Sequence, residues 1–387
     1  MQATMATAFN ISAPFMPFFL IQLGVESTAH VALWTGAIAS AGALVLAFVS
    51  PYWGAYADRN GRKQTVIRCC IVPALCFALT GFCQAPWQVF AVFALSGGFG
   101  GFSASAMALV GTQAPEGRLG YALGWMATGQ FIGTLAGPMI GGLLADHVHD
   151  YRLIFIWLAV GVLVATALTM TFVHERFERP PPGQERPPFR QQVQEVVRHP
   201  TLLPLLFVLL LAQLTTYAAI PIIPLYIRAL IGDVPWLSTA AGAAIAIAGV
   251  AGIIATPWLG RQGDRIGYRR VLVGSLGCAA LFTFPQALIG NLWTFLALRF
   301  SAGLFLGGIL PSANALIGRV FPREQRGRIY GITSSAGYLG LASGPALGGL
   351  IGAELGFSAV FVVVGALLVV TLVLVTLSAE KGEQRAT

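Results

Sequence analysis

Residues 53–63 read WGAYADRNGRK and place a cluster of charge between two long apolar runs. Charged residues make up only 10% of the 387-residue chain, yet four of them fall within the last six positions of this stretch. A charged segment between apolar runs is typical of a short loop at a membrane surface. The charged residues are Asp58, Arg59, Arg62 and Lys63.

The composition of the whole chain indicates an integral membrane protein. Hydrophobic residues make up 56% of it, whereas soluble domains are about 45–50% apolar and about 25% charged. The net charge of +8 reflects Lys and Arg in loops, so we interpret it as a topology signal and exclude a nucleic-acid surface. The cysteines lie in apolar runs without metal-ligand or disulfide spacing, and we expect them to be packing residues. They are Cys69, Cys70, Cys76, Cys83 and Cys278.

Twelve apolar runs are long enough to span a bilayer, which takes about 20 mostly apolar residues per helix. The predicted fold class is therefore an all-α integral membrane protein with twelve transmembrane helices. The runs lie near residues 1–23, 31–52, 66–84, 87–110, 121–144, 152–173, 201–227, 237–258, 271–290, 292–317, 329–351 and 356–378.

An internal repeat divides these helices into two pseudo-symmetric halves. Asp58 and Gly61 recur 206 positions later as Asp264 and Gly267. Two six-helix halves, related by an axis along the membrane normal, are the arrangement of alternating-access carriers. The segment between the halves is rich in Pro and charge, which is typical of a solvated linker. The predicted domains are the first half at 1–173, a cytoplasmic linker at 174–200 and the second half with a short tail at 201–387.

The distribution of Lys and Arg predicts the orientation. These residues gather in the loops after even-numbered helices and in the linker, whereas only Arg152 and Arg228 fall on the opposite side. We therefore expect both termini in the cytoplasm and the protein in the plasma (inner) membrane. The repeat places the start of helix 7 at a position equivalent to one before Met1, so we also expect the native start to lie upstream.

The motifs resemble those of a known family. GAYADRNGRK resembles the signature loop of the major facilitator superfamily, and GRQGDRIGYRR is its echo in the second half. The run GTLAGPMIGG resembles the antiporter motif in helix 5 of this family, which is common in drug exporters. Within the superfamily the chain is most similar to bacterial multidrug exporters of the drug:proton antiporter group. The resemblance implies the major facilitator fold and proton-coupled export of small lipophilic or drug-like compounds by alternating access.

The two charged loops are predicted to form a cytoplasmic latch. Asp58 is expected to complement a helix N-terminus and pair with a nearby arginine in one carrier state and to separate in the other. The alternative is a positive-inside anchor that only fixes topology. The predicted latch residues are Gly54, Asp58, Arg59, Gly61, Arg62, Lys63, Gly260, Asp264, Arg265, Gly267 and Arg269.

Small residues recur in the antiporter-type motif of helices 5 and 11. Glycines spaced four apart make a smooth helix face that a neighbouring helix approaches closely. We expect these faces to rock between states; the alternative is ordinary small-residue packing. The motif residues are Gly133, Gly137, Pro138, Gly141, Gly142, Gly340, Gly344, Pro345, Gly348 and Gly349.

Polar residues at membrane depth are candidates for a substrate cavity between the halves, and each is alternatively a helix-packing contact. Arg299 stands apart because a charge inside a span is costly and usually functional. Thr215 and Thr216 belong to the wider polar set. The phenylalanines near Phe15 offer apolar surface for lipophilic compounds; the alternative is that they face lipid or pack between helices. The candidate cavity residues are Asn10, Gln130, Gln213, Tyr217, Arg299, Asn314 and Tyr338.

Two departures from the family pattern concern coupling. Phe93 stands where drug:proton antiporters commonly carry a helix-4 arginine, and no Asp, Glu or His falls at the midplane of a span. Without a buried carboxylate we expect neutral or anionic substrates, the latter paired with Arg299. Alternatives on the same fold are an uptake or metabolite permease and a non-transporting membrane sensor.

Other classes of protein are not predicted. No nucleophile–base or metal-ligand constellation and no P-loop is visible, so we expect neither an enzyme nor a cofactor. The expected partners are a small-molecule substrate, protons and the lipid bilayer, and we expect a monomer.

Overall fold

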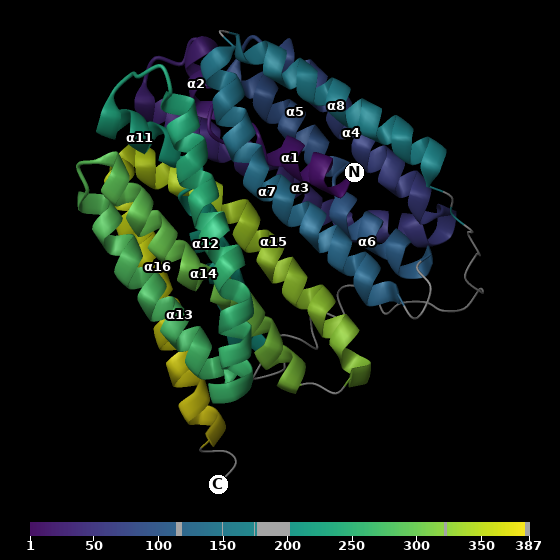
Figure 1. Cartoon of the computed structure of the whole chain (residues 1–387), viewed down its shortest axis with the longest axis vertical. Coiled ribbons are helices and arrows are strands. Elements are labelled where there is room, and N and C mark those ends of the chain that lie inside the picture. The colour runs from purple at the N-terminus through teal and green to yellow at the C-terminus, as the bar shows by residue number, and fades with distance from the viewer. Residues whose placement is uncertain (114–117, 149, 174, 176–201, 321–322, 384–387) are drawn as a thin grey trace. The chain divides into compact units, whose positions relative to one another are not determined.

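The computed structural model describes residues 1–113, 118–148, 150–173, 175, 202–320 and 323–383, and every regular element in these ranges is a helix (Figure 1). The helices up to the linker are α1 (Gln2–Asn10), α2 (Met16–Gln22), α3 (Thr28–Asn60), α4 (Arg62–Gly81), α5 (Pro86–Gly98), α6 (Phe102–Gln113), α7 (Leu119–His147) and α8 (Tyr151–Phe172). The later ones are α10 (Leu202–Ala218), α11 (Ile223–Ile231), α12 (Leu237–Ile266), α13 (Tyr268–Thr283), the short 3₁₀ helix η2 (Phe284–Leu288), α14 (Leu292–Val320), α15 (Arg323–Glu354) and α16 (Phe357–Glu383).

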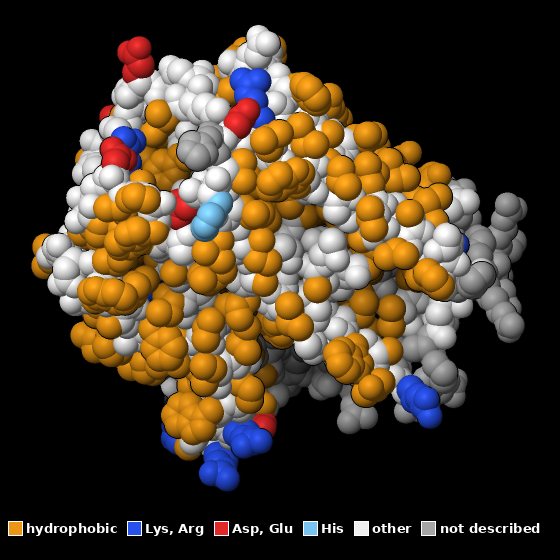
Figure 2. All heavy atoms as spheres, turned by 45° about the horizontal axis from the view of Figure 1, so that its top comes forward, with side chains coloured by type: hydrophobic (Ala, Val, Ile, Leu, Met, Phe, Trp, Pro, Cys, Tyr) orange, Lys and Arg blue, Asp and Glu red, His pale blue; other side chains and the backbone are white. Residues whose placement is uncertain are grey.

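The helices match the predicted transmembrane pattern. Nine helical stretches in the described ranges are long and apolar enough to cross a membrane. Each of the twelve predicted spans coincides with one helix or with two consecutive ones. Hydrophobic side chains cover much of the surface in view, and charged side chains are few there (Figure 2). The fold is an all-α membrane fold of twelve spans.

The first and the seventh predicted spans, at 1–23 and 201–227, are each broken into two helices. The sequence prediction did not include these breaks. In the first half α1 ends at Asn10 and α2 begins at Met16; in the second half α10 ends at Ala218 and α11 begins at Ile223. Pro14 and Pro221 lie at equivalent positions in the two breaks. Proline lacks a backbone N–H and its ring clashes with the preceding turn, so it interrupts the helical ladder.

Aromatic clusters pack against both broken helices. The ring centroids of Phe19 and Phe155 are 5.2 Å apart, and those of Tyr226 and Phe361, at the same places in the repeat, are 5.0 Å apart. Phe15 and Phe19 are fully buried. These two rings therefore pack in the helix core, which is one of the alternatives that the sequence left open for them.

The glycines of α7, which is the fifth predicted span, form one contact face of this helix. A Cβ atom at Gly141 would overlap the carbonyl group of Ile11, and one at Gly137 would lie 2.9 Å from the Cβ of Asn10. Glycine faces of this kind let backbones approach closely, which stabilises helix pairs in lipid. Four glycines spaced four residues apart lie against α1 and the residue that follows it: Gly129, Gly133, Gly137 and Gly141.

The same motif makes two further contacts. Gly142 lies against the backbone of Ser238 at the start of α12, and Pro138 lies against Gly242 one turn further along. In the second half α15 packs on α10: a Cβ at Gly344 would lie 2.8 Å from the carbonyl oxygen of Leu214. The motif residues of α15 at the repeat positions are all buried, namely Gly340, Gly344, Pro345, Gly348 and Gly349.

Helix pairing repeats between the halves. α1 packs with α7 as α10 packs with α15, and α4 packs with α8 as α13 packs with α16. Figure 1 shows α13, α14 and α16 beside one another in the second half. These matching pairs confirm the internal repeat.

Contacts divide the chain into two compact units. One consists of Met1–Gln184 and Asp233–Ala246, and the other of Glu185–Gly232 and Ile247–Thr387. The first turns of α12 therefore pack with the helices of the first half. The linker predicted at 174–200 lies outside the described residues except for Glu175, so its role stays a prediction.

We predict that Gly141→Ala lowers the thermal stability of the purified protein. The added methyl group would meet the Ile11 carbonyl, and overpacking of this kind costs about 1–3 kcal/mol. Gly124→Ala, in the same helix, is the matched control because no other atom lies within 4 Å of its Cβ position. Equal unfolding midpoints for the two variants would show that the glycine face is not required for packing.

Candidate functional site

The opening stretch of sequence is mostly helix and not loop. α3 continues to Asn60, so the turn between helices 2 and 3 consists of Gly61 alone, with φ 101° and ψ 145°. Gly267 makes the equivalent turn between α12 and α13 with φ 96° and ψ 135°. A residue with a Cβ is strained at such angles, so glycine is required at both turns.

A carboxylate that the sequence did not single out binds at the first turn. The backbone N–H groups of Arg62 and Lys63 donate to the two carboxylate oxygens of Glu175, at 2.9 and 2.8 Å. These N–H groups open α4 and have no partner within their own helix. Glu175 thus caps α4, where its negative charge also complements the helix dipole.

The basic residues after each turn bind carbonyl groups of neighbouring helices. The Lys63 ammonium donates to the Met170 carbonyl of α8 at 3.0 Å. The Arg269 guanidinium donates to the Thr376 carbonyl of α16, also at 3.0 Å. Both donors and both acceptors are separated by 206 positions, so this contact is duplicated with the fold. Met170 lies in the last turn of α8, where the helix dipole favours a basic group.

The remaining predicted latch residues have different surroundings in the two halves. Asp264 is exposed and accepts a short hydrogen bond from the Tyr268 hydroxyl, one turn away. Arg62 also reaches the Ala108 carbonyl of α6, at 3.3 Å. Arg265 is exposed, and Gly260 has open space beside it. The side chains of Asp58 and Arg59 and the surroundings of Gly54 lie outside the described part of the structure, so a latch through Asp58 stays a prediction.

Polar residues of the first half meet in a network on three helices. The Gln2 amide of α1 donates to the Ser103 hydroxyl of α6 at 2.9 Å and to the Gln130 carboxamide oxygen of α7 at 2.5 Å. Ser103 also donates to Gln130, at 2.9 Å. The carboxamide oxygen of Gln2 is buried without a hydrogen-bond partner. Of this network the sequence indicated only Gln130, because Gln2 and Ser103 are far from it along the chain.

The other candidate polar residues are placed less closely together. Asn10 donates to the Ala6 carbonyl of its own helix at 2.8 Å. Thr215 and Thr216 likewise donate to carbonyls one turn back in α10. In the second half Arg299 is buried in α14 with 9% of its surface exposed. Gln213, Tyr217 and Asn314 are half-buried, and Tyr338 is exposed.

Helix 4 is broken between α5 and α6, which the sequence prediction of one span at 87–110 missed. The chain bends at residues 99–101, where Gly101 has a φ of 92°. The indole N–H of Trp53 donates to the freed Gly98 carbonyl at 2.7 Å, and the Cys69 thiol donates to the Gly100 carbonyl at 3.2 Å. The Arg68 guanidinium lies 3.2 Å from the centroid of the Trp53 ring. These contacts satisfy the polar groups that a broken helix exposes in lipid.

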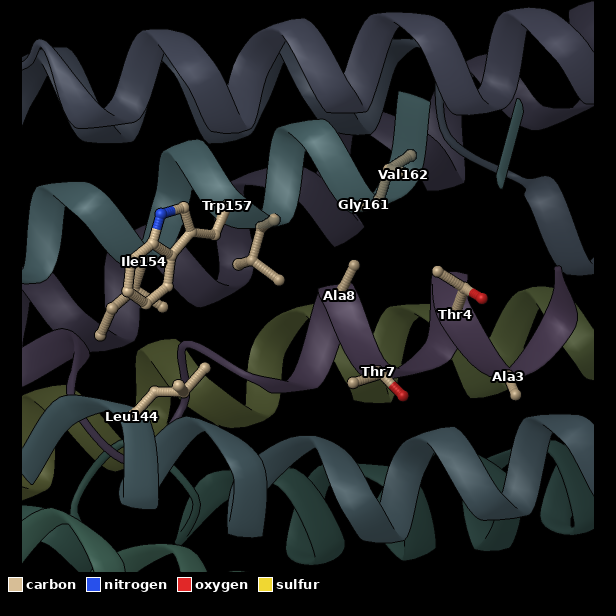
Figure 3. Close-up of a pocket in the computed structure, with 10 residues that line it drawn as sticks. Ala3, Thr4, Thr7, Ala8, Leu144, Ile154, Trp157, Gly161 and Val162 are labelled. Atoms are coloured by element: carbon tan, nitrogen blue, oxygen red, sulfur yellow. The ribbon is translucent and has the colours of Figure 1, made fainter. Parts of the chain in front are cut away.

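A cavity of about 400 Å³ opens between α1, α7 and α8 in the first half. Figure 3 shows Thr4 and Ala8 of α1 facing Gly161 and Val162 of α8 across it. Its lining is mainly apolar, and none of the candidate cavity residues from the sequence takes part in it. The cavity is therefore separate from the residues predicted to line the substrate cavity.

Comparison with known proteins identifies the family. The model described as Major Facilitator Superfamily matches residues 1–255 and again residues 205–387. The chain belongs to the major facilitator superfamily. It is thus a multi-pass membrane transporter, as the signature loop and the repeat predicted.

Relatives of this major facilitator chain include three proteins named multidrug resistance protein MdtG. The one from Serratia proteamaculans is 37% identical over 358 residues, which cover 92% of this chain and 86% of the relative. The one from Salmonella typhimurium is 36% identical over 357 residues, covering 92% and 88%. The one from Proteus mirabilis is 35% identical over 354 residues, covering 91% and 87%.

Solved structures share the fold at low sequence identity. A bacterial homologue of the human lysosomal transporter Spinster, in an inward-facing and unoccupied conformation, aligns with a TM-score of 0.76 at 16% identity, covering 98% of this chain and 96% of that one. The nucleoside transporter NupG aligns with a TM-score of 0.77 at 12% identity, covering 97% and 98%. These similarities support the major facilitator fold alone.

We predict that Gly267→Ala destabilises the turn between α12 and α13. Its φ of 96° lies in the left-handed region, which costs a residue with a Cβ roughly 1–2 kcal/mol. Gly260→Ala is the control, since this position is helical and open, and alanine there gains up to about 1 kcal/mol of helix propensity. The thermal midpoint of Gly267→Ala should fall below that of Gly260→Ala; the reverse order would refute the strain argument.

Proposed function

We propose that this chain is a secondary carrier that exports small lipophilic or drug-like compounds by alternating access. The observation that carries the proposal is identity of 35–37% to MdtG proteins over at least 91% of the chain. Identity at this level extends over both halves, so it includes the helices that line the substrate path in such carriers. We further propose that it acts as a monomer in the inner membrane with both termini in the cytoplasm.

Export driven by proton antiport is the coupling that we propose. The charged residues of the described spans offer few groups for it, since Phe93 occupies the helix-4 position and the acidic residues lie near helix ends. Proton exchange would then involve carboxylates at the membrane surfaces, where water reaches them, and not a buried acid at the midplane.

The proposed substrate class follows from the charged side chains buried within the spans. A desolvated cation requires a buried carboxylate, whereas a neutral or anionic compound does not. Arg299 is a buried cation in α14, and we propose that it pairs with an anionic group of the substrate or orients a polar one. Gln213, Tyr217 and Asn314 supply further hydrogen-bonding groups on α10 and α14, and Gln130 stays a separate candidate on α7.

Transport by proteoliposomes tests the proposed function directly. The purified chain is reconstituted, a fluorescent lipophilic dye is added, and a pH gradient is imposed. Dye flux that rises with the gradient and stops when an ionophore collapses it would support antiport. Flux without gradient dependence would indicate a facilitated permease, and no flux for any compound would favour a membrane sensor.

We predict a preference for neutral and anionic dyes over a cationic dye of similar size. The reason is the lack of a carboxylate to pair with a desolvated cation. Initial rates of export are measured for the three dyes in the same proteoliposomes. A faster rate for the cationic dye would contradict the proposed substrate class.

We predict that Arg299→Ala reduces flux of the anionic dye at least about tenfold, the effect of losing one charge-assisted hydrogen bond of about 1.5–3 kcal/mol. Arg261→Ala is the control, because Arg261 is an exposed arginine at the end of α12. Unchanged flux in Arg299→Ala, with normal protein yield, would assign Arg299 to packing.

A further inference from the structure

The last turn of α7 ends in a carboxylate that caps a helix of the other sequence half. Asp146 accepts hydrogen bonds from the backbone N–H groups of Ser238 and Thr239, at 2.9 and 2.7 Å. Each carboxylate oxygen binds one of the two N–H groups, which belong to the first turn of α12. An ionised carboxylate at this place is favoured by both the hydrogen bonds and the helix dipole.

Backbone contact continues inward from this cap. A Cβ atom at Gly142 would overlap the backbone of Ser238, and one at Gly242 would overlap the carbonyl group of Pro138. α7 and the first two turns of α12 are therefore joined by a seam with Asp146 at its outer end. The seam is tight because two glycines remove the side chains that would hold the helices apart.

α12 is shared between two packing environments. Its residues up to Ala246 belong to the unit of the first half, and its residues from Ile247 onward belong to the other unit. In the inner part the Thr256 hydroxyl donates to the Gly307 carbonyl of α14 at 2.9 Å. The described contacts of α7 with α12 lie at Ser238, Thr239 and Gly242, in the first two turns of α12.

The Asp146 contact has no counterpart in the repeat. The position 207 residues later is Ala353, which cannot cap a helix through its side chain. The neighbouring polar groups do not serve the same N–H groups: His147 binds the Leu143 carbonyl of its own helix, and Asp150 binds the backbone of Arg152 and the Gln22 amide. Asp146 is the described carboxylate that holds α12 at this end.

We propose that Asp146 is an external latch of the transport cycle, a positioning residue that holds the start of α12 against α7 and releases it when the outer end of the seam opens. The inference rests on the proposed alternating-access function and on the orientation predicted from Lys and Arg. Asp146 is half-buried at a helix end, so water can replace its partners after separation. Such a contact is specific when made and inexpensive to break, as a reversible latch requires.

Spin-label distances test the latch without relying on transport. The native cysteines are replaced, and labels are attached at His147→Cys and Trp236→Cys, two exposed positions beside the seam. We expect a dominant short distance in the parent protein. In Asp146→Ala the long-distance population should rise about fivefold, the ratio that the loss of one helix N-cap typically produces.

Two further variants make the result decisive. Asp150→Ala removes a neighbouring carboxylate that caps α8 and should keep the parent distribution. Asp146→Asn keeps the shape and one acceptor oxygen, so it should fall between, and it decides the case if Asp146→Ala does not fold. The proposal is overturned if the Asp146 variants match Asp150→Ala. Failure of the parent protein to carry any dye would instead refute the proposed function and leave the distance result as it is.

Discussion

Close packing of helix backbones at glycine faces holds this fold together. At these faces no side chain keeps the two backbones apart. In lipid the hydrophobic effect does not drive helices together, so van der Waals contact between backbones must supply the attraction. Gly141 against Ile11, and Gly348 against Ala218 at the repeat position, are the points of closest approach. Both lie where the first or the seventh span breaks, at the ends of α1 and α10.

Some stabilising contacts occur in both halves because the fold is duplicated. Other contacts occur in one half only, and these show where the halves differ. The ammonium or guanidinium that binds a carbonyl across the bundle occurs in both halves, at Lys63 and at Arg269. The Trp53 and Arg68 stack occurs once, since Leu259 and Gly274 occupy the repeat positions. Helix 4 is broken beside that stack, whereas helix 10 is the continuous α14. A bend in one half alone means that the two halves need not move in the same way.

Much of the fold was predictable because its signals are local. Span length, basic loops and glycine spacing depend on residues that are neighbours along the chain. The end of α3 was not predictable from hydropathy, since its last helical turns carry the charges of a loop. The breaks near Pro14 and Pro221 were missed because a broken span has the composition of a continuous one.

The candidate site was less predictable because its contacts join distant residues. Glu175 caps α4 from 112 residues away, and Asp146 caps α12 from 92. Gln130 was found because it is polar in an apolar run, whereas its partner Gln2 stands near the first residue and gave no such contrast. The role of Phe15 and Phe19 stayed open between a lipophilic surface and helix packing because sequence alone does not distinguish a core ring from an exposed one.

We infer that the carrier works by opening the seam between α7 and α12 while the glycine-packed pairs α1–α7 and α10–α15 stay closed. Chemical cross-linking with a flexible bis-maleimide tests it most directly, in protein without native cysteines. One pair, Leu143→Cys with Thr239→Cys, bridges the seam; the other, Leu211→Cys with Leu341→Cys, bridges α10 and α15. We predict that linking the first pair abolishes dye flux in proteoliposomes and that linking the second preserves it. Flux that survives linkage of the seam, or that is lost on linkage of α10 to α15 alone, would contradict the account.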